Sequence, residues 1–136
     1  MKLIYSKIEP TTLLHIIHKA NDFFQNRVDL VDADQPLQVS ALVAHKGKTF
    51  RPHKHIYCEK TTTTTQESWV VIKGKVQAIL YDLDDQIIAK EILEPGDVSI
   101  TLRGGHNYLM LEDNTFVYEY KTGPYLGQEN DKVFID

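Results

Sequence analysis

The amino-acid sequence predicts a mainly β protein with a jelly-roll-like barrel or sandwich. Between residues 37 and 121, apolar and polar residues alternate over short runs, which is the side-chain period of a β-strand. Turn-forming clusters rich in Gly, Asp, Asn and Pro separate these runs at close spacing. No segment repeats at a fixed period, which favours a barrel or sandwich over a solenoid.

Length and composition predict one domain covering residues 1–136. The chain carries a net charge of −4 and has no basic stripe, so we expect no nucleic-acid partner. No wholly apolar run exceeds four residues, so we expect no membrane partner either. Lysines at positions 2 and 7 interrupt the first residues, which lack the apolar core of a signal peptide. With a single cysteine and hence no internal disulfide, the sequence predicts a cytoplasmic protein.

A helix is predicted at about residues 10–23. Apolar residues recur there at steps of three and four, and Pro10 suits a first helical turn. This pattern places His15 and His18 on a polar, solvated face. Residues 25–36 hold several turn-forming side chains and are expected to form a connector.

The barrel is expected over about residues 37–121, followed by a tail at 122–136 that packs back on the body. Five consecutive threonines at 61–65 provide no large apolar side chain for a core, and they predict a solvated loop. The predicted strands are 37–44, 49–57, 67–72, 76–82, 86–93, 98–102, 106–111 and 115–121.

Two histidines on one predicted strand are the first sign of a site. His53 and His55 are two residues apart, so both imidazoles face the same side of that strand. Glu67 begins the next strong strand, and His106 opens a later one that a closed β-roll can bring alongside. Three imidazole nitrogens and one carboxylate oxygen suit a divalent transition metal ion, with iron, manganese, nickel, cobalt and zinc left open. A polar strand face without metal is the alternative.

The spacing of these residues resembles the two motifs of the RmlC-like cupin superfamily, and most closely the WbuC-type cupin-fold metalloproteins. The first motif-like stretch contains Gly47, His53-Lys54-His55, Glu67 and Gly74. The second contains residues 94–97 (Glu-Pro-Gly-Asp) and 102–106 (Leu-Arg-Gly-Gly-His), and a later Gly-Pro-Tyr at 123–125 completes the likeness.

This resemblance implies a cupin double-stranded β-helix that binds one divalent metal ion through His53, His55, Glu67 and His106. Glu59 or Cys58 could replace Glu67 as a ligand, and Cys58 could otherwise be a small buried side chain. The resemblance also implies a small polar ligand such as a sugar, a role in bacterial surface-polysaccharide biosynthesis, and a homodimer.

Three activities remain open under this interpretation. One is a metal-dependent sugar or sugar-nucleotide isomerase or epimerase, one is a metal-dependent dioxygenase, and one is a metal-free epimerase with His55 as the base. A non-catalytic module that binds or senses a small ligand is the alternative from another class. No catalytic residue is assigned. Arg51, Trp69 and Tyr108 are the candidate pocket residues, although most aromatic side chains of a barrel simply fill its interior.

Overall fold

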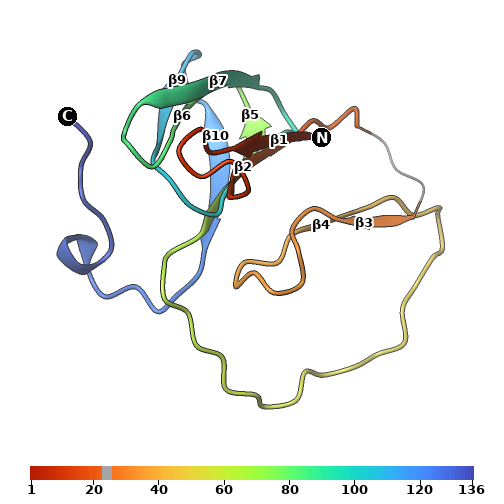
Figure 1. Cartoon of the computed structure of the whole chain (residues 1–136). Coiled ribbons are helices and arrows are strands. Elements are labelled where there is room, and N and C mark those ends of the chain that lie inside the picture. The colour runs from red at the N-terminus through yellow and green to blue at the C-terminus, as the bar shows by residue number, and fades with distance from the viewer. Residues whose placement is uncertain (23–25) are drawn as a thin grey trace.

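A computed structural model describes residues 1–22 and 26–136, and in this part of the chain the fold is mainly β, as predicted. The strands form three antiparallel sheets, and none of these sheets closes into a barrel (Figure 1). The strands are β1 (Lys2–Tyr5), β2 (Leu13–His18), β3 (Arg27–Asp29), β4 (Ser40–Leu42), β5 (Glu67–Lys73), β6 (Val76–Tyr81), β7 (Ile87–Leu93), β8 (Val98–Thr101), β9 (His106–Met110) and β10 (Phe116–Lys121), and a 3-10 turn (Gln128–Asn130) follows them.

The five-stranded sheet, in the order β1-β2-β8-β5-β10, carries a row of polar residues across one face. Its register sets His15 opposite Thr101, Thr101 opposite Glu67, and Glu67 opposite Lys121. Residues directly opposite each other in antiparallel strands point to the same side of the sheet. The register alone therefore brings together four polar side chains that are far apart in the sequence.

The three-stranded sheet, in the order β7-β6-β9, packs on that same face. Val76, Ala78 and Leu80 alternate along β6 and are fully buried against Val71 and Ile17 of the larger sheet. This apolar contact occupies the middle of the interface between the two sheets. The polar row therefore lies at the border of a packed core.

The β3–β4 hairpin and the chain beside it cover the opposite face of the five-stranded sheet. Leu30 and Val31 pack there against Ile16 and Ile100, which are both completely buried. The fold is thus three layers deep over β2 and β8, with two separate apolar clusters.

The predicted helix at residues 10–23 is wrong where the structure describes it. Residues 13–18 form the strand β2, and His15 and His18 are buried, not solvated. Residue 23 lies outside the described residues. The sequence Leu-Leu-His-Ile-Ile-His is short and apolar on both faces, as suits a strand with a core on each side. Its apolar spacing also matches the helical period, which produced the error.

The six strands predicted between residues 67 and 121 are confirmed, with ends shifted by one or two residues. The segment before them differs from the prediction. Only Ser40–Leu42 of the predicted strand 37–44 is a strand, and residues 49–57 form none. Residues 25–36 contain β3 from Arg27 onward, and residue 25 lies outside the described residues.

Residues 43–64, which include four of the five threonines, form a long exposed excursion between β4 and β5 (Figure 1). Proline at position 52 cannot donate to a sheet ladder, which weakens a strand there. Cys58 lies in this excursion and is exposed, so the expectation of a buried side chain is wrong.

The C-terminal tail contacts the body at Ile135, whose side chain lies against Gly105. The other apolar residues expected to pack there, Tyr125, Val133 and Phe134, are 56%, 91% and 76% exposed. None of the described segments forms a helix with the length and apolarity that a membrane crossing requires.

His15 links the two main sheets within the interior. Its Nε2 lies 3.0 Å from the carbonyl oxygen of Tyr81, and its Nδ1 lies 3.1 Å from Thr101 Oγ1. A carbonyl only accepts, so Nε2 carries the proton, and Nδ1 of the neutral ring accepts from the threonine hydroxyl. Burial lowers the pKa of His15 to about 4, against the opposing effect of the Tyr81 hydrogen bond. The ring is therefore neutral over the physiological pH range.

We predict that the free energy of unfolding falls by up to about 3 kcal/mol as the pH drops from about 6.5 to about 4 because of His15. In this window the unfolded chain binds a proton at His15 and the folded chain does not, so acid favours unfolding. Urea unfolding at several pH values measures the slope. His15→Gln should flatten it, whereas the exposed control His45→Gln should keep the wild-type slope; equal slopes in all three proteins would contradict the assignment.

Candidate functional site

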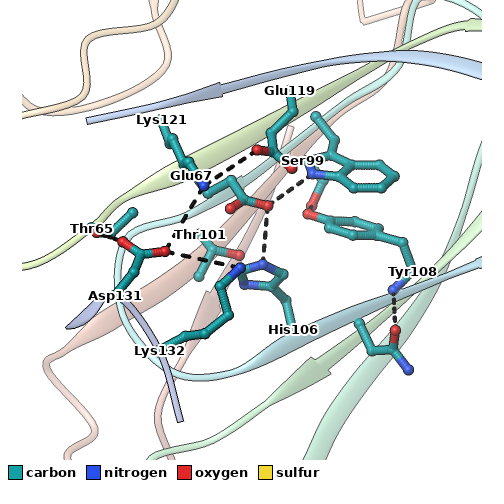
Figure 2. Close-up of polar contacts among 12 residues, drawn as sticks. Thr65, Glu67, Ser99, Thr101, His106, Tyr108, Glu119, Lys121, Asp131 and Lys132 are labelled. Carbon is teal, nitrogen blue, oxygen red and sulfur yellow. Dashed lines mark hydrogen bonds and ion pairs between the residues drawn. The ribbon is translucent and has the colours of Figure 1, made fainter. Parts of the chain in front are cut away.

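The carboxylate of Glu67 is the centre of the polar border between the two main sheets. It accepts two hydrogen bonds at Oε1, from Trp69 Nε1 at 2.8 Å and from His106 Nε2 at 3.1 Å (Figure 2). Only 8% of the Glu67 side chain is exposed. Glu67 and Trp69 belong to β5 while His106 begins β9, so this carboxylate joins one sheet to the other.

Glu67 is ionised despite its burial. Burial by itself would raise the pKa of the carboxyl group, but the hydrogen bond and positive charge of His106 and the hydrogen bond from Trp69 outweigh it. The Lys132 ammonium acts in the same direction, and the pKa lies below its ordinary value. The site therefore presents a fixed negative charge in a largely water-excluded position.

His106 presents two different nitrogen atoms. Nε2 faces the ionised Glu67 and so carries the proton of that hydrogen bond. Nδ1 is buried and has no hydrogen-bond partner in residues 1–22 and 26–136. The carboxylate therefore fixes the orientation of the imidazole, and the nitrogen that it does not contact is enclosed by the protein.

An aromatic wall adjoins this pair. The rings of Trp69 and Tyr108 are stacked, with centroids 4.0 Å apart and planes 16° from parallel. The Tyr108 hydroxyl donates to Ser99 Oγ at 3.2 Å. Burial raises the pKa of this phenol above its ordinary value, so Tyr108 stays neutral. Glu67 and Trp69 are two residues apart on β5, and they face His106 and Tyr108, which are two residues apart on β9. The Glu67 carboxylate contacts the His106 imidazole, and the Trp69 ring stacks on the Tyr108 ring.

A cavity of about 440 Å³ opens beside Glu67 and His106. The C-terminal tail forms its far wall and supplies both an acid and a base. Asp131 accepts from Thr65 Oγ1 at 2.6 Å and lies 3.9 Å from both the Lys121 and the Lys132 ammonium groups (Figure 2). The cavity is lined by Thr65, Glu67, Tyr81, Gly105, His106, Asn107 and the tail residues Asp131, Lys132, Val133, Phe134 and Ile135.

The structure divides the predicted metal ligands into two pairs. Glu67 and His106 are in contact, whereas His53 and His55 lie next to each other in the exposed excursion, with ring centroids 5.5 Å apart. Within the described ranges, no group of three or more His, Cys, Asp or Glu side chains is placed to hold a metal ion.

Glu59 and Cys58, the two alternative ligands, are exposed in the same excursion as His53 and His55. The assignment of the four ligands stays a prediction. Of the three candidate pocket residues, Trp69 and Tyr108 lie at Glu67, and Arg51 is exposed beside His53.

Sequence reasoning missed the charged residues around Glu67 and the cavity. Lys121 sits opposite Glu67 in the β5–β10 register, and this pairing is not visible before the strands are aligned. Asp131 and Lys132, which line the cavity, come from an irregular tail, where no periodicity indicates which way a side chain points. The one available signal was an adjacent acid and base directly before the apolar residues 133–135.

The fold and site define a mainly β protein with an acid–imidazole pair at a cavity, and with a Trp69–Tyr108 stack that adjoins the pair but does not line the cavity. No family model and no solved structure matches the chain. The chain is similar to a curated protein of Halobacterium salinarum named as a probable 6-carboxy-5,6,7,8-tetrahydropterin synthase, with 41% identity over 73 residues. The match covers 49% of this chain and 46% of the relative, so the chain spans about half the length of the protein it matches.

This relative overturns the cupin interpretation. The likeness to WbuC-type cupins rested on short motifs, whereas the match to the tetrahydropterin synthase is an alignment over half of the chain. The predicted sugar-acting metal cupin of polysaccharide biosynthesis is therefore wrong. The structure agrees on two points, because its sheets do not close into a barrel and its described residues gather no metal-binding cluster.

We predict that Glu67→Ala lowers the free energy of unfolding by about 1–3 kcal/mol, because Trp69 Nε1 and His106 Nε2 both lose their acceptor. Urea unfolding followed by tryptophan emission measures this locally, since Trp69 is the single tryptophan. The matched control is Glu119→Ala on the neighbouring strand, whose half-exposed carboxylate pairs only with Lys121 among the described residues. The control should change stability by less than about 0.5 kcal/mol, and an equal loss in both variants would contradict a special role for Glu67.

Proposed function

We propose that the cavity beside Glu67 binds a reduced pterin carrying an acidic substituent, and that the chain acts in tetrahydropterin synthesis. The observation that carries this proposal is the ionised Glu67 carboxylate, which Trp69 and His106 hold in place at the lining of the cavity. The name of the Halobacterium relative, a probable 6-carboxy-5,6,7,8-tetrahydropterin synthase, supplies the class of ligand.

The carboxylate suits the hydrogen-bonding edge of a pterin. Oε1 of Glu67 is already used by Trp69 and His106, while no described residue donates a hydrogen bond to Oε2. An ionised carboxylate offers about four acceptor positions, so Oε2 can accept further donors. The pyrimidine ring of a pterin presents a ring N–H beside an exocyclic amino group, two adjacent donors that match a carboxylate.

The size and charge of the cavity suit the rest of such a ligand. A volume of about 440 Å³ lies within the range of small-molecule sites and accommodates a bicyclic ring. Lys132 stands on the tail across the cavity from β5 and β9, and its ammonium is 3.9 Å from Asp131. In this proposal Lys132 pairs with the acidic substituent while Glu67 holds the opposite end of the ring.

His106 is the proton carrier in this proposal. Its contact with Glu67 fixes the orientation of the imidazole, and its second nitrogen has no partner within the described part of the chain. A bound ring held by Glu67 lies beside this imidazole, and the proton exchanged with the ligand in this proposal is the one that Nε2 shares with Glu67, because Nδ1 is enclosed.

We predict that 6-carboxypterin, an air-stable analogue of the product named for the relative, quenches the Trp69 emission on binding. Glu67→Gln removes the negative charge with little change of shape and should weaken binding about 10- to 100-fold. Glu119→Gln is the control and should bind like the wild type. Absence of saturable quenching in the wild type, or equal affinity in Glu67→Gln, would exclude this site for pterins.

We predict that Lys132→Met weakens binding of 6-carboxypterin about 10-fold but leaves the affinity for unsubstituted pterin unchanged, because only the former carries a carboxylate. The control is Lys90→Met on β7, an exposed lysine that does not line the cavity. Competition titrations with both ligands provide the measurement. Equal losses for the two pterins would assign Lys132 a structural role.

A further inference from the structure

Strand β10, labelled in Figure 1, is an edge strand of the five-stranded sheet. It carries a row of exposed aromatic rings. Phe116, Tyr118 and Tyr120 are 46%, 50% and 54% exposed. The ring centroids of Phe116 and Tyr118 are 5.0 Å apart, and those of Tyr118 and Tyr120 are 6.3 Å apart. Three large rings in one exposed row are more than scattered surface apolar residues and mark a contact surface.

This row is exposed because the third layer of the fold does not reach it. The β3–β4 hairpin covers Ile16 on β2 and Ile100 on β8, which lie three and two strands away from β10. Ile72 on β5, beside the row, is also 44% exposed. This face of the sheet is therefore apolar where the hairpin covers it, and it stays apolar on β5 and β10, where the hairpin does not reach.

The backbone of β10 is open along one side as well. Within the described residues it pairs only with β5. Exposed edge strands normally carry outward charges that prevent pairing with another chain. In β10 the two charged residues point to the other face of the sheet, where Lys121 lies 3.6 Å from Glu119 and 3.9 Å from Asp131. The usual protection of an edge is thus absent on the aromatic side.

We propose that β10 pairs antiparallel with β10 of a second copy of this chain, about a two-fold axis at Tyr118. In this register Tyr118 lies opposite Tyr118, and Phe116 of each copy lies opposite Tyr120 of the other. All six rings then share one face of a continuous ten-stranded sheet. Cross-strand aromatic pairs of this kind are the favourable unit of sheet stabilisation.

The neighbouring registers are less favourable for a physical reason. The two faces of a strand alternate, so a two-fold axis through a residue keeps the aromatic rows on one face, whereas an axis between residues does not. An axis at Glu119 would set two carboxylates directly opposite each other. An axis at Val117 or at Tyr120 would leave a ring opposite Asn114 or Pro124, outside the strand.

A substitution at the axis tests the interface. Tyr118→Lys places two like charges opposite each other and should raise the dimer dissociation constant at least 10-fold in sedimentation equilibrium. Tyr57→Lys is the control, because Tyr57 is fully exposed and lies far along the chain in the excursion; it should leave the dimer intact. A wild type that stays monomeric at 100 µM, or a Tyr118→Lys protein that dimerises like the wild type, would overturn the proposal.

Disulfide trapping tests the register and does not depend on how Tyr118→Lys folds. In a Cys58→Ser background, Tyr118→Cys should oxidise to a covalent dimer, because opposite Cα atoms in antiparallel strands are about 5 Å apart. Tyr120→Cys alone should not, since its two copies would be about 14 Å apart along the strands. An equimolar mixture of Phe116→Cys and Tyr120→Cys should give the mixed dimer. Equal cross-linking of Tyr118→Cys and Tyr120→Cys would overturn the register.

Discussion

The buried carboxylate of Glu67 is the interaction on which the arrangement of this protein depends. An ionised group withdrawn from water needs hydrogen-bond donors, and here the donors come from both main sheets. Trp69 donates from the same strand, and His106 donates from β9 across the interface. The two sheets must therefore keep a fixed spacing at this point, and that spacing also sets the Trp69–Tyr108 stack.

The candidate function uses the same geometry. The apolar cluster around Val71, Val76 and Leu80 closes the interface on one side of the polar row, and the C-terminal tail borders the cavity on the other. A ligand that enters meets the fixed negative charge of Glu67, the imidazole of His106 and the Lys132 ammonium. The proposed pterin site and the proposed β10 interface lie on opposite faces of one sheet, so the two proposals can be tested separately.

The alternating pattern was a good guide wherever a strand has one buried face. It placed β5 to β10 within one or two residues, and it placed Trp69 and Tyr108 on the correct strands. It failed where the pattern was ambiguous. Residues 13–18 are apolar on both faces, and only burial between two layers decides that they form a strand and not a helix. Short histidine spacings likewise indicated a cupin, and a match over half of the chain was needed to correct this.

The sequence by itself determined the β class, the strands from residue 67 onward, and the side of each strand that carries Glu67, Trp69, His106 and Tyr108, because alternation is a local property of the chain. Only the tertiary structure decided that Lys121 lies opposite Glu67, that Asp131 and Lys132 complete the cavity, and that His53 and His55 stand apart from it. Those relations depend on strand register and on the path of irregular segments. Both are set by contacts between residues far apart in sequence, which no local pattern records.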